Sequence, residues 1–326
     1  GRLPNSRAVI DAVAKHAKET DFVGFYAGGP MARGFADSRG QRNWHRVESF
    51  QFDWCLYRSG DKAVKSSYAG TMWEEASFAA RMSAAREQLA LLGRPVKTLD
   101  PGEYRVYFSP VAVADLLGTL SWGGFGHKDL QTGVSTLVRA HRGQAKFNRS
   151  VTLVEATAEG IAPRFQPDGF VKPSSVALVK NGELAQTLVS PRSAREYKVA
   201  ANGANSQESP DSLAMTGGEL AATDVLEALD TGVYISDLHY LNYSDRQACR
   251  MTGMTRFACF WVEKGRIVAP ISVMRFDDSL LRMFGEGLVA LTHDAELVPD
   301  NSTYGERALR SVTAPGAIVE GFRFTL

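Results

Sequence analysis

Residues 252–284 read TGMTRFACFWVEKGRIVAPISVMRFDDSLLRMF, and their pattern indicates the class of fold. Two apolar runs flank Lys264-Gly265, which predicts a β-hairpin with its tip at these two residues. A second hairpin is predicted over 174–190, where Asn181-Gly182, the strongest short turn signal, separates two apolar runs. Strands joined by hairpins, rather than alternating regularly with helices, favour an α+β protein with a mostly antiparallel sheet.

The first 94 residues predict a smaller unit ahead of this sheet. We expect a helix over 6–19 and then a β region, in which DFVGFYAGG (21–29) forms a strand that ends at its glycines. In the same region Phe50, Phe52, Trp54 and Leu56 alternate with less apolar residues, the period of a half-buried strand. An alanine-rich helix is predicted over 73–92. We place the domain boundary at this helix, with a strand at 103–110 and a helix at 111–120 after it.

Composition limits the function classes. The chain has 326 residues, with 37 basic and 36 acidic side chains and a net charge of +1, so no nucleic-acid-binding or membrane-surface charge is indicated. No apolar run approaches the ~20 residues of a membrane-spanning helix. Three cysteines in a long chain favour reduced thiols and a cytoplasmic location. Because the sequence opens with Gly1 and enters a helix almost at once, we expect a fragment of a longer chain.

The stretch LLGTLSWGGFGHKDLQTGVS (116–135) invites a catalytic interpretation through His127 and Asp129. The six histidines include no pair four residues apart, as a helical metal site would need, and no G-x-S-x-G nucleophile elbow occurs. Gly124-Phe125-Gly126 is more typical of a tight turn than of a phosphate loop. From the residues alone, 127–129 is interpreted as a solvated polar loop, although distant residues could still assemble a metal site.

Three segments, read in order, resemble the TldD/PmbA family, also called modulators of DNA gyrase. They are DFVGFYAGGPMARGFADSRGQRNWH (21–45), YFSPVAVADLLGTL (107–120) and the opening stretch 252–284. The resemblance implies an α+β fold whose mostly antiparallel C-terminal domain follows part of an N-terminal α/β domain. It assigns 1–72 to the remainder of the N-terminal domain, 73–94 to a connecting helix and 95–326 to the C-terminal domain.

The family has two kinds of member, and the resemblance distinguishes them by a metal motif. TldD-type members are metallopeptidases in which His-Glu-x-x-x-His and a later cysteine hold zinc. Aligning the leucine pair at 116–117 with the leucines before that motif places its first histidine at Gly118, its glutamate at Thr119 and its second histidine at Gly123. The cysteine falls at Tyr304. None of these residue types is retained, so the four positions are predicted to be vestigial and no catalytic or metal-binding residue is assigned.

The first functional hypothesis is therefore a non-catalytic TldE/PmbA-like subunit of a TldD/TldE-type metallopeptidase system acting on unfolded or leader peptides. Its expected partners are a TldD-type subunit or a second copy of the chain, and extended peptides, with zinc only in the TldD-type partner and no nucleic acid or membrane. A second hypothesis is a peptidase or hydrolase with relocated chemistry, drawing on His127, Asp129, His239 or Tyr304 in the same cleft. A third is a gyrase-linked regulatory protein, which the neutral charge disfavours.

Overall fold

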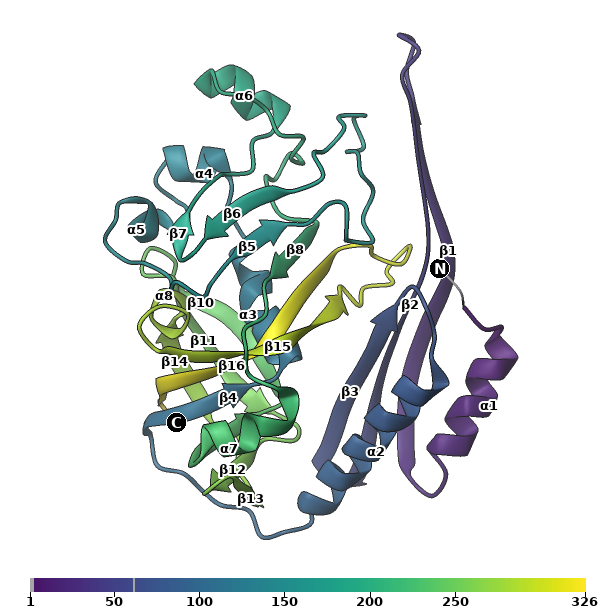
Figure 1. Ribbon diagram of the computed structural model, residues 1–326, viewed down its shortest axis with the longest axis vertical. Coiled ribbons are helices and arrows are strands. Elements are labelled where there is room, and N and C mark those ends of the chain that lie inside the picture. The colour runs from purple at the N-terminus through teal and green to yellow at the C-terminus, as the bar shows by residue number, and fades with distance from the viewer. Residues whose placement is uncertain (1–2, 61) are drawn as a thin grey trace.

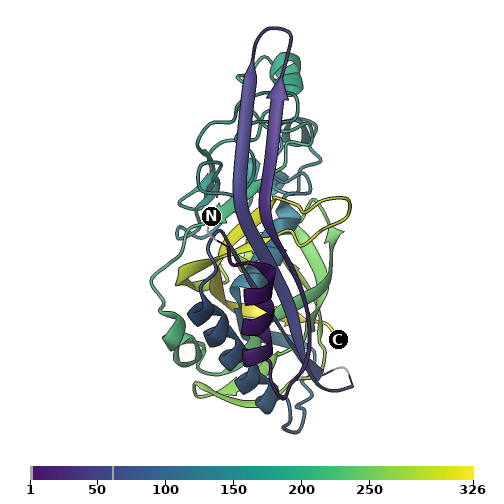
Figure 2. The same ribbon diagram turned by 90° about the vertical axis from the view of Figure 1, so that its right-hand side faces the viewer.

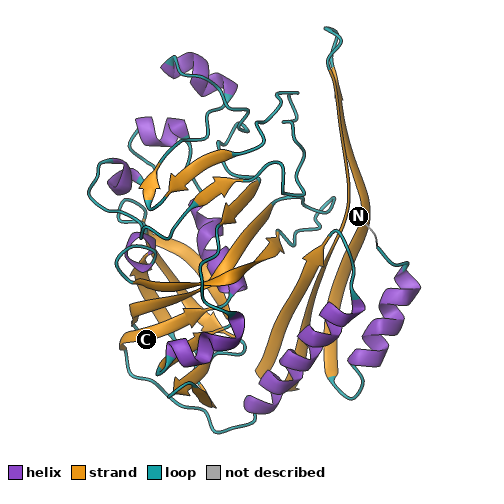
Figure 3. Ribbon diagram, in the orientation of Figure 1, coloured by secondary structure: helices purple, strands orange, loops and turns teal. Residues whose placement is uncertain are grey.

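The computed structural model describes residues 3–60 and 62–326, and it separates them into two β-sheets with helices around them (Figures 1 and 3). A three-stranded sheet with two helices forms one side of the molecule. A large mixed sheet with short helices and long loops forms the other side. The expected α+β class with mostly antiparallel pairing is confirmed, and only two strand pairs of the large sheet, β4–β9 and β8–β16, are parallel.

The smaller sheet is an antiparallel meander of β1 (Asp21–Ala36), β2 (Arg42–Ser59) and β3 (Lys62–Gly70). The half-buried strand predicted over 50–56 is confirmed. One face of β2 packs its aromatic residues against α1 (Ser6–His16) and α2 (Glu75–Leu91). Phe52, Trp54 and Phe78 lie within 5.6 Å of one another, centroid to centroid, in this core. The opposite face of β2 and β3 carries polar residues that lie toward the large sheet, among them Gln51, Asp53, Lys65 and Ser67.

The expected end of the first strand at its glycines is wrong. β1 continues through Gly28, Gly29 and Pro30 to Ala36, paired with β2 along its whole length. Proline is compatible with this place because β1 is an edge strand, where a missing N–H removes no hydrogen bond from a neighbour. The β1–β2 hairpin therefore runs along the whole molecule (Figure 2), and its far part is tied to the other side by Asn43 Nδ2, which donates to the Gly169 carbonyl at 2.8 Å.

The large sheet has the order β13-β12-β9-β4-β16-β8-β5-β6-β7, with β10, β11, β14 and β15 branching from it. Both predicted hairpin turns are present, with positive φ at Asn181 and Gly182 and at Lys264 and Gly265. The strands are β4 (Gly102–Phe108), β5 (Leu153–Glu155), β6 (Val176–Lys180), β7 (Glu183–Leu184), β8 (Ser212–Met215), β9 (Gly232–Ile235), β10 (Asp237–Asp245), β11 (Arg250–Arg256), β12 (Phe260–Glu263), β13 (Arg266–Pro270), β14 (Arg275–Ser279), β15 (Leu288–Pro299) and β16 (Ser311–Phe324).

Helix α3 (Pro110–Leu120) follows β4 directly and packs against β16. Its start is encoded locally: Ser109 is the N-cap, its Oγ accepts from the Ala112 N–H at 3.1 Å, and Pro110 occupies the first turn. The short helices are α4 (His127–Gln131), α5 (Val138–His141), α6 (Pro191–Tyr197), η1 (Ala222–Asp224), α7 (Val225–Leu229) and α8 (Leu280–Met283). Across 3–60 and 62–326, no helix has the length and apolar character needed to cross a membrane.

Candidate functional site

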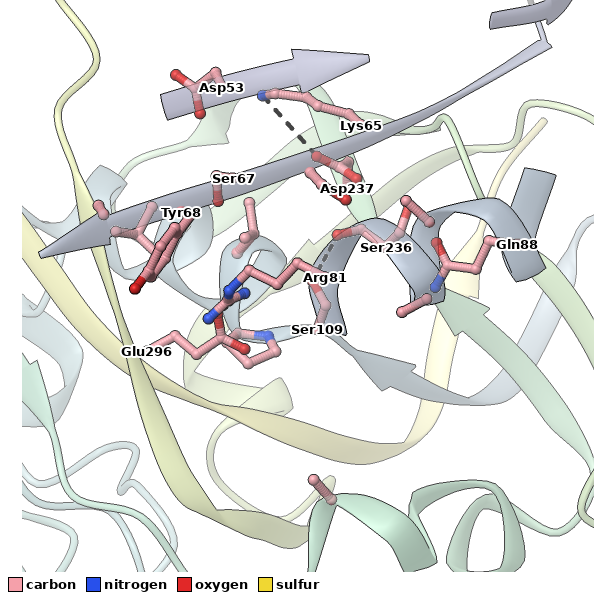
Figure 4. A pocket seen from close by; sticks show the side chains of 18 of the residues that line it. Asp53, Lys65, Ser67, Tyr68, Arg81, Gln88, Ser109, Ser236, Asp237 and Glu296 are labelled. Carbon is pink, nitrogen blue, oxygen red and sulfur yellow. Dashed lines mark hydrogen bonds and ion pairs between the residues drawn. The ribbon is translucent and has the colours of Figure 1, made fainter. Parts of the chain in front are cut away.

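A cavity of about 830 Å³ lies between the small sheet and the large one (Figure 4). One wall is formed by β2, β3 and α2, and the other by the ends of β4 and β9, by α3 and by β15. β4 and β9 are parallel neighbours, so Ser109 and Ser236 follow adjacent strand ends, and Ser109 Oγ donates to the Ser236 carbonyl at 2.5 Å. A volume of this size is in the range of ligand sites.

The lining of this cavity is strongly acidic although the chain is nearly neutral. Basic side chains are limited to Lys65 and Arg81 among its described residues. Arg81 is occupied by Glu296, with Nη1 at 2.8 Å from Oε2. The carboxyl groups that line the cavity are Asp53, Glu87, Asp115, Asp237, Asp294, Glu296 and Asp300. Seven carboxylates thus face two cations, and both cations already have a carboxylate partner, Lys65 at the longer distance of 4.0 Å from Asp237.

Asp115 and Asp237 are the two carboxyl groups most perturbed by this environment. Burial raises the pKa of Asp115 to about 7, and the neighbouring charge of Asp237 adds to that effect. Burial also raises the pKa of Asp237 to about 6, while Lys65, with Nζ at 4.0 Å from Oδ1, opposes the rise. Near neutral pH the Asp115 carboxyl is therefore partly protonated, and perturbed carboxyl groups of this kind mark candidate functional sites.

Gln51, on β2 in the opposite wall, is a polar group of the cavity lining that lacks a hydrogen-bond partner. It is 3% exposed and lines the cavity, yet its Nε2 donates no hydrogen bond to any described residue. A buried amide without a partner costs free energy, about 1–3 kcal/mol, unless a ligand or water satisfies it. Gln51 is on the polar face of β2, opposite Ala69 of β3.

Two strand edges also border the cavity. β3 pairs only with β2, and the 294–299 half of β15 pairs only with β16, among the described strands. The two strands approach each other, and both contribute to the cavity lining. Their outer N–H and C=O groups can therefore accept an added strand.

A second cavity, of about 390 Å³, lies beside the first, and Asp115 lines both. Gly118 and Thr119 line this smaller cavity, with Trp122 at its rim. A side chain built at Gly118 would meet open space, whereas Thr119 is buried and its Oγ1 donates to the Leu116 carbonyl at 2.6 Å. The structure thus places two of the four sequence-predicted vestigial positions together at one cavity.

The other two vestigial positions lie outside both cavities. Gly123 follows the end of α3 with φ of +90°, and a Cβ there would approach Asp129 Oδ2 to 2.5 Å. Tyr304 is 99% exposed, in the loop whose two ends, Asp300 and Arg310, line the smaller cavity. Within 3–60 and 62–326, no group of three or more His, Cys, Asp or Glu side chains is arranged to hold a metal ion.

The three polar residues predicted as cleft candidates line neither cavity. His127 and Asp129 share helix α4, where His127 Nδ1 lies 3.0 Å from Thr187 Oγ1. Burial raises the pKa of Asp129, and the charge of Glu208 adds to the rise. His239 is exposed on β10 and packs edge-on against Tyr240. Their functional role stays a prediction.

Sequence reasoning missed Asp115, Asp237 and Gln51. A signal existed for Asp115, because it is the one charged residue in the apolar helix PVAVADLLGTL (110–120). Asp237 is the first residue of β10, and Gln51 lies between Phe50 and Phe52, but neither position is unusual by itself. Only the fold shows that the three meet at one cavity.

The fold and cavities define an α+β protein in which a helix-bearing small sheet closes over the large mixed sheet. Residues 101–326 match the family model described as the PmbA/TldA metallopeptidase C-terminal domain. The chain belongs to this PmbA/TldD family, as the sequence resemblance implied. No curated protein sequence matches the chain.

Solved structures share the fold over nearly the whole chain. TldE from Thermococcus kodakarensis is similar with a TM-score of 0.81 at 13% identity, covering 100% of this chain and 77% of that one. A Thermotoga maritima protein described as a candidate modulator of a DNA gyrase has a TM-score of 0.78 at 16% identity, covering 99% and 75%. A Bacteroides thetaiotaomicron protein with a similar description has a TM-score of 0.74 at 16% identity, covering 99% and 72%.

Proposed function

We propose that this chain is a non-catalytic, TldE/PmbA-like subunit that works with a TldD-type metallopeptidase on unfolded or leader peptides. The observation that carries the proposal is the state of α3, the helix that the resemblance aligns with the metal motif. At the aligned positions it presents Gly118 and Thr119 to a cavity, and neither can supply a zinc ligand or a general base. The likeness in fold to TldE supports the same assignment.

The geometry at Gly123 supports the loss of the second histidine. A side chain at this position would have to displace Asp129 and hold φ near +90°, a conformation unfavourable for residues with a Cβ. The backbone here is therefore adapted to glycine. Restoring a histidine would need a rearrangement of the turn after α3, in addition to a change of residue.

The peptide role rests on the two strand edges beside the large cavity. An extended peptide that pairs with β3 or β15 would be held by main-chain hydrogen bonds, which recognise any sequence. Such a subunit would present unfolded segments to the catalytic partner. Cys55, Cys249 and Cys259 are all free thiols, which supports a reducing, cytoplasmic setting.

The proposal is tested by co-expressing the tagged chain with a TldD-type subunit from the same cell. We expect the two to elute together at fixed stoichiometry, and peptidase activity toward casein to require both. A chain that elutes only as a monomer or homodimer, and leaves the activity of the TldD-type subunit unchanged, would contradict it.

The alternative of relocated catalysis is tested on the isolated chain. Casein turnover that is abolished by His127→Ala or His239→Ala would favour it. Because these residues line neither cavity, we expect no turnover at any pH between 5 and 9 in wild type or in either variant.

A further inference from the structure

We propose that the large cavity selects a positively charged group of its peptide, an α-ammonium group or a lysine or arginine side chain, and that Asp115 and Asp237 bind it. The inference rests on the peptide-binding role proposed above and adds a preference to it. It concerns the cavity between the two sheets, apart from the motif positions on α3.

The first argument is the excess of negative charge around the cavity, where seven carboxylates face two basic side chains. Asp237 lines the cavity with 7% of its side chain exposed, and its only ion pair among the described residues is the long one to Lys65, with Nζ at 4.0 Å from Oδ1. Asp115 forms neither a hydrogen bond nor an ion pair within 3–60 and 62–326. Buried charges in proteins are normally paired. A ligand cation would supply the partner that Asp115 lacks and a closer one than Lys65 for Asp237.

The second argument is the unpartnered amide of Gln51, which faces the cavity from the opposite wall. Its Nε2 is a donor, so it requires an acceptor such as a peptide carbonyl. A cationic peptide could satisfy both kinds of group at once. Its positive charge would pair with Asp115 and Asp237, and one of its carbonyl oxygens would accept a hydrogen bond from Gln51 Nε2. An inorganic cation would satisfy only the first.

The aromatic surroundings fit the same ligand. Tyr68, Tyr107 and Tyr234 line the cavity, and Tyr107 and Tyr234 pack together with ring centroids 5.1 Å apart. Tyrosine rings attract ammonium and guanidinium groups and also cover the apolar stem of a lysine or arginine side chain. An anionic group would instead meet the seven carboxylates of the lining and be repelled.

The test measures binding of three eight-residue peptides with one C-terminal fluorophore, by fluorescence anisotropy. The first is acetylated and carries one lysine, the second is acetylated with norleucine in its place, and the third carries norleucine and a free α-amine. Each is titrated with the chain alone and with its complex with the TldD-type subunit. We expect the lysine peptide, the free-amine peptide or both to bind at least about tenfold more tightly than the neutral one, about 1.4 kcal/mol.

Asp115→Asn and Asp237→Asn should each reduce this preference severalfold, and Asp168→Asn, at an exposed aspartate outside the cavity, should leave it unchanged. Lys65→Met should increase the preference by removing the competing cation, which keeps the test decisive if an asparagine variant fails to fold. Equal binding of all three peptides would overturn the inference and leave peptide binding intact. Binding of no peptide, alone or in complex, would overturn both proposals.

Discussion

The two cavities that share Asp115 differ in what their walls offer. The smaller cavity lies where the family resemblance places a metal site, and α3 presents it with Gly118 and the internally bonded Thr119. The larger cavity contains seven carboxylates against two basic side chains, and the Gln51 amide, whose nitrogen has no partner among the described residues. The comparison teaches that the carboxylates and the free amide lie beside the motif positions rather than at them.

The largest expected effect is on the free energy of unfolding, through the aromatic core that lies behind the β2 wall of the large cavity. Phe78 of α2 is completely buried in the aromatic core behind β2. Phe78→Ala should lower the free energy of unfolding by about 3–5 kcal/mol, because it removes a buried ring and leaves a void. Urea unfolding measures this. Val23→Ala, at an exposed position of β1, should change it by less than about 0.5 kcal/mol. Equal losses in the two variants would show that this core does not support the wall.

The next effect separates two glycines at positions that the family resemblance aligns with the metal motif. Gly123→His should cost about 2 kcal/mol, because it combines a positive φ with a clash against Asp129. Gly118→His should change stability by less than about 1 kcal/mol, since its side chain would enter open space and glycine is a poor helix former. Thermal denaturation of the two variants compares them directly. A larger loss for Gly118→His would contradict the described turn.

Asp115, which lines both cavities, should make the free energy of unfolding depend on pH. Its pKa rises from 3.8 to about 7 on folding, so between those values the folded state binds the extra proton. The contribution of Asp115 to the free energy of unfolding therefore falls as pH rises from 4 to 7. Above pH 7 the carboxylate is ionised in both states, and its burial destabilises the folded protein in full. Asp115→Asn should raise the free energy of unfolding by about 1–2 kcal/mol at pH 8 and have little effect at pH 4. Urea titrations at both pH values check this, and a gain of the same size at pH 4 would exclude the electrostatic cause.

The smallest effect concerns Gln51. Gln51→Met keeps the length of the side chain and removes the unpartnered donor, so it should be neutral or stabilising by up to about 1 kcal/mol. Peptide binding to the large cavity should weaken at the same time. A variant that loses stability by more than about 1 kcal/mol would indicate that the amide is satisfied in solution.

Much of the fold follows from local signals. Asn181-Gly182 and Lys264-Gly265 fix two turns because both residues of each adopt positive φ, and the alternation of Phe50 to Leu56 fixes which face of β2 is buried. Local signals fail where tertiary pairing overrides them. Gly28 to Pro30 look like a strand end, yet β2 pairs with this segment and continues it.

The candidate site is harder to predict because its residues are distant in sequence. Gln51, Asp115 and Asp237 come from β2, α3 and the start of β10, and each has an ordinary local pattern except for the lone charge in α3. Their common place at one cavity depends on how the small sheet packs against the large one. The family resemblance located α3, but it directed attention to Gly118, Thr119 and Gly123 rather than to the neighbouring carboxylate.

The central claim is that this chain has no catalytic metal centre of its own. The most direct test is the zinc content of the purified chain, measured by mass spectrometry after incubation with zinc and gel filtration, together with its peptidase activity. The account predicts well under one zinc per chain and no turnover until a TldD-type subunit is added. One zinc per chain with activity in the isolated protein would contradict it.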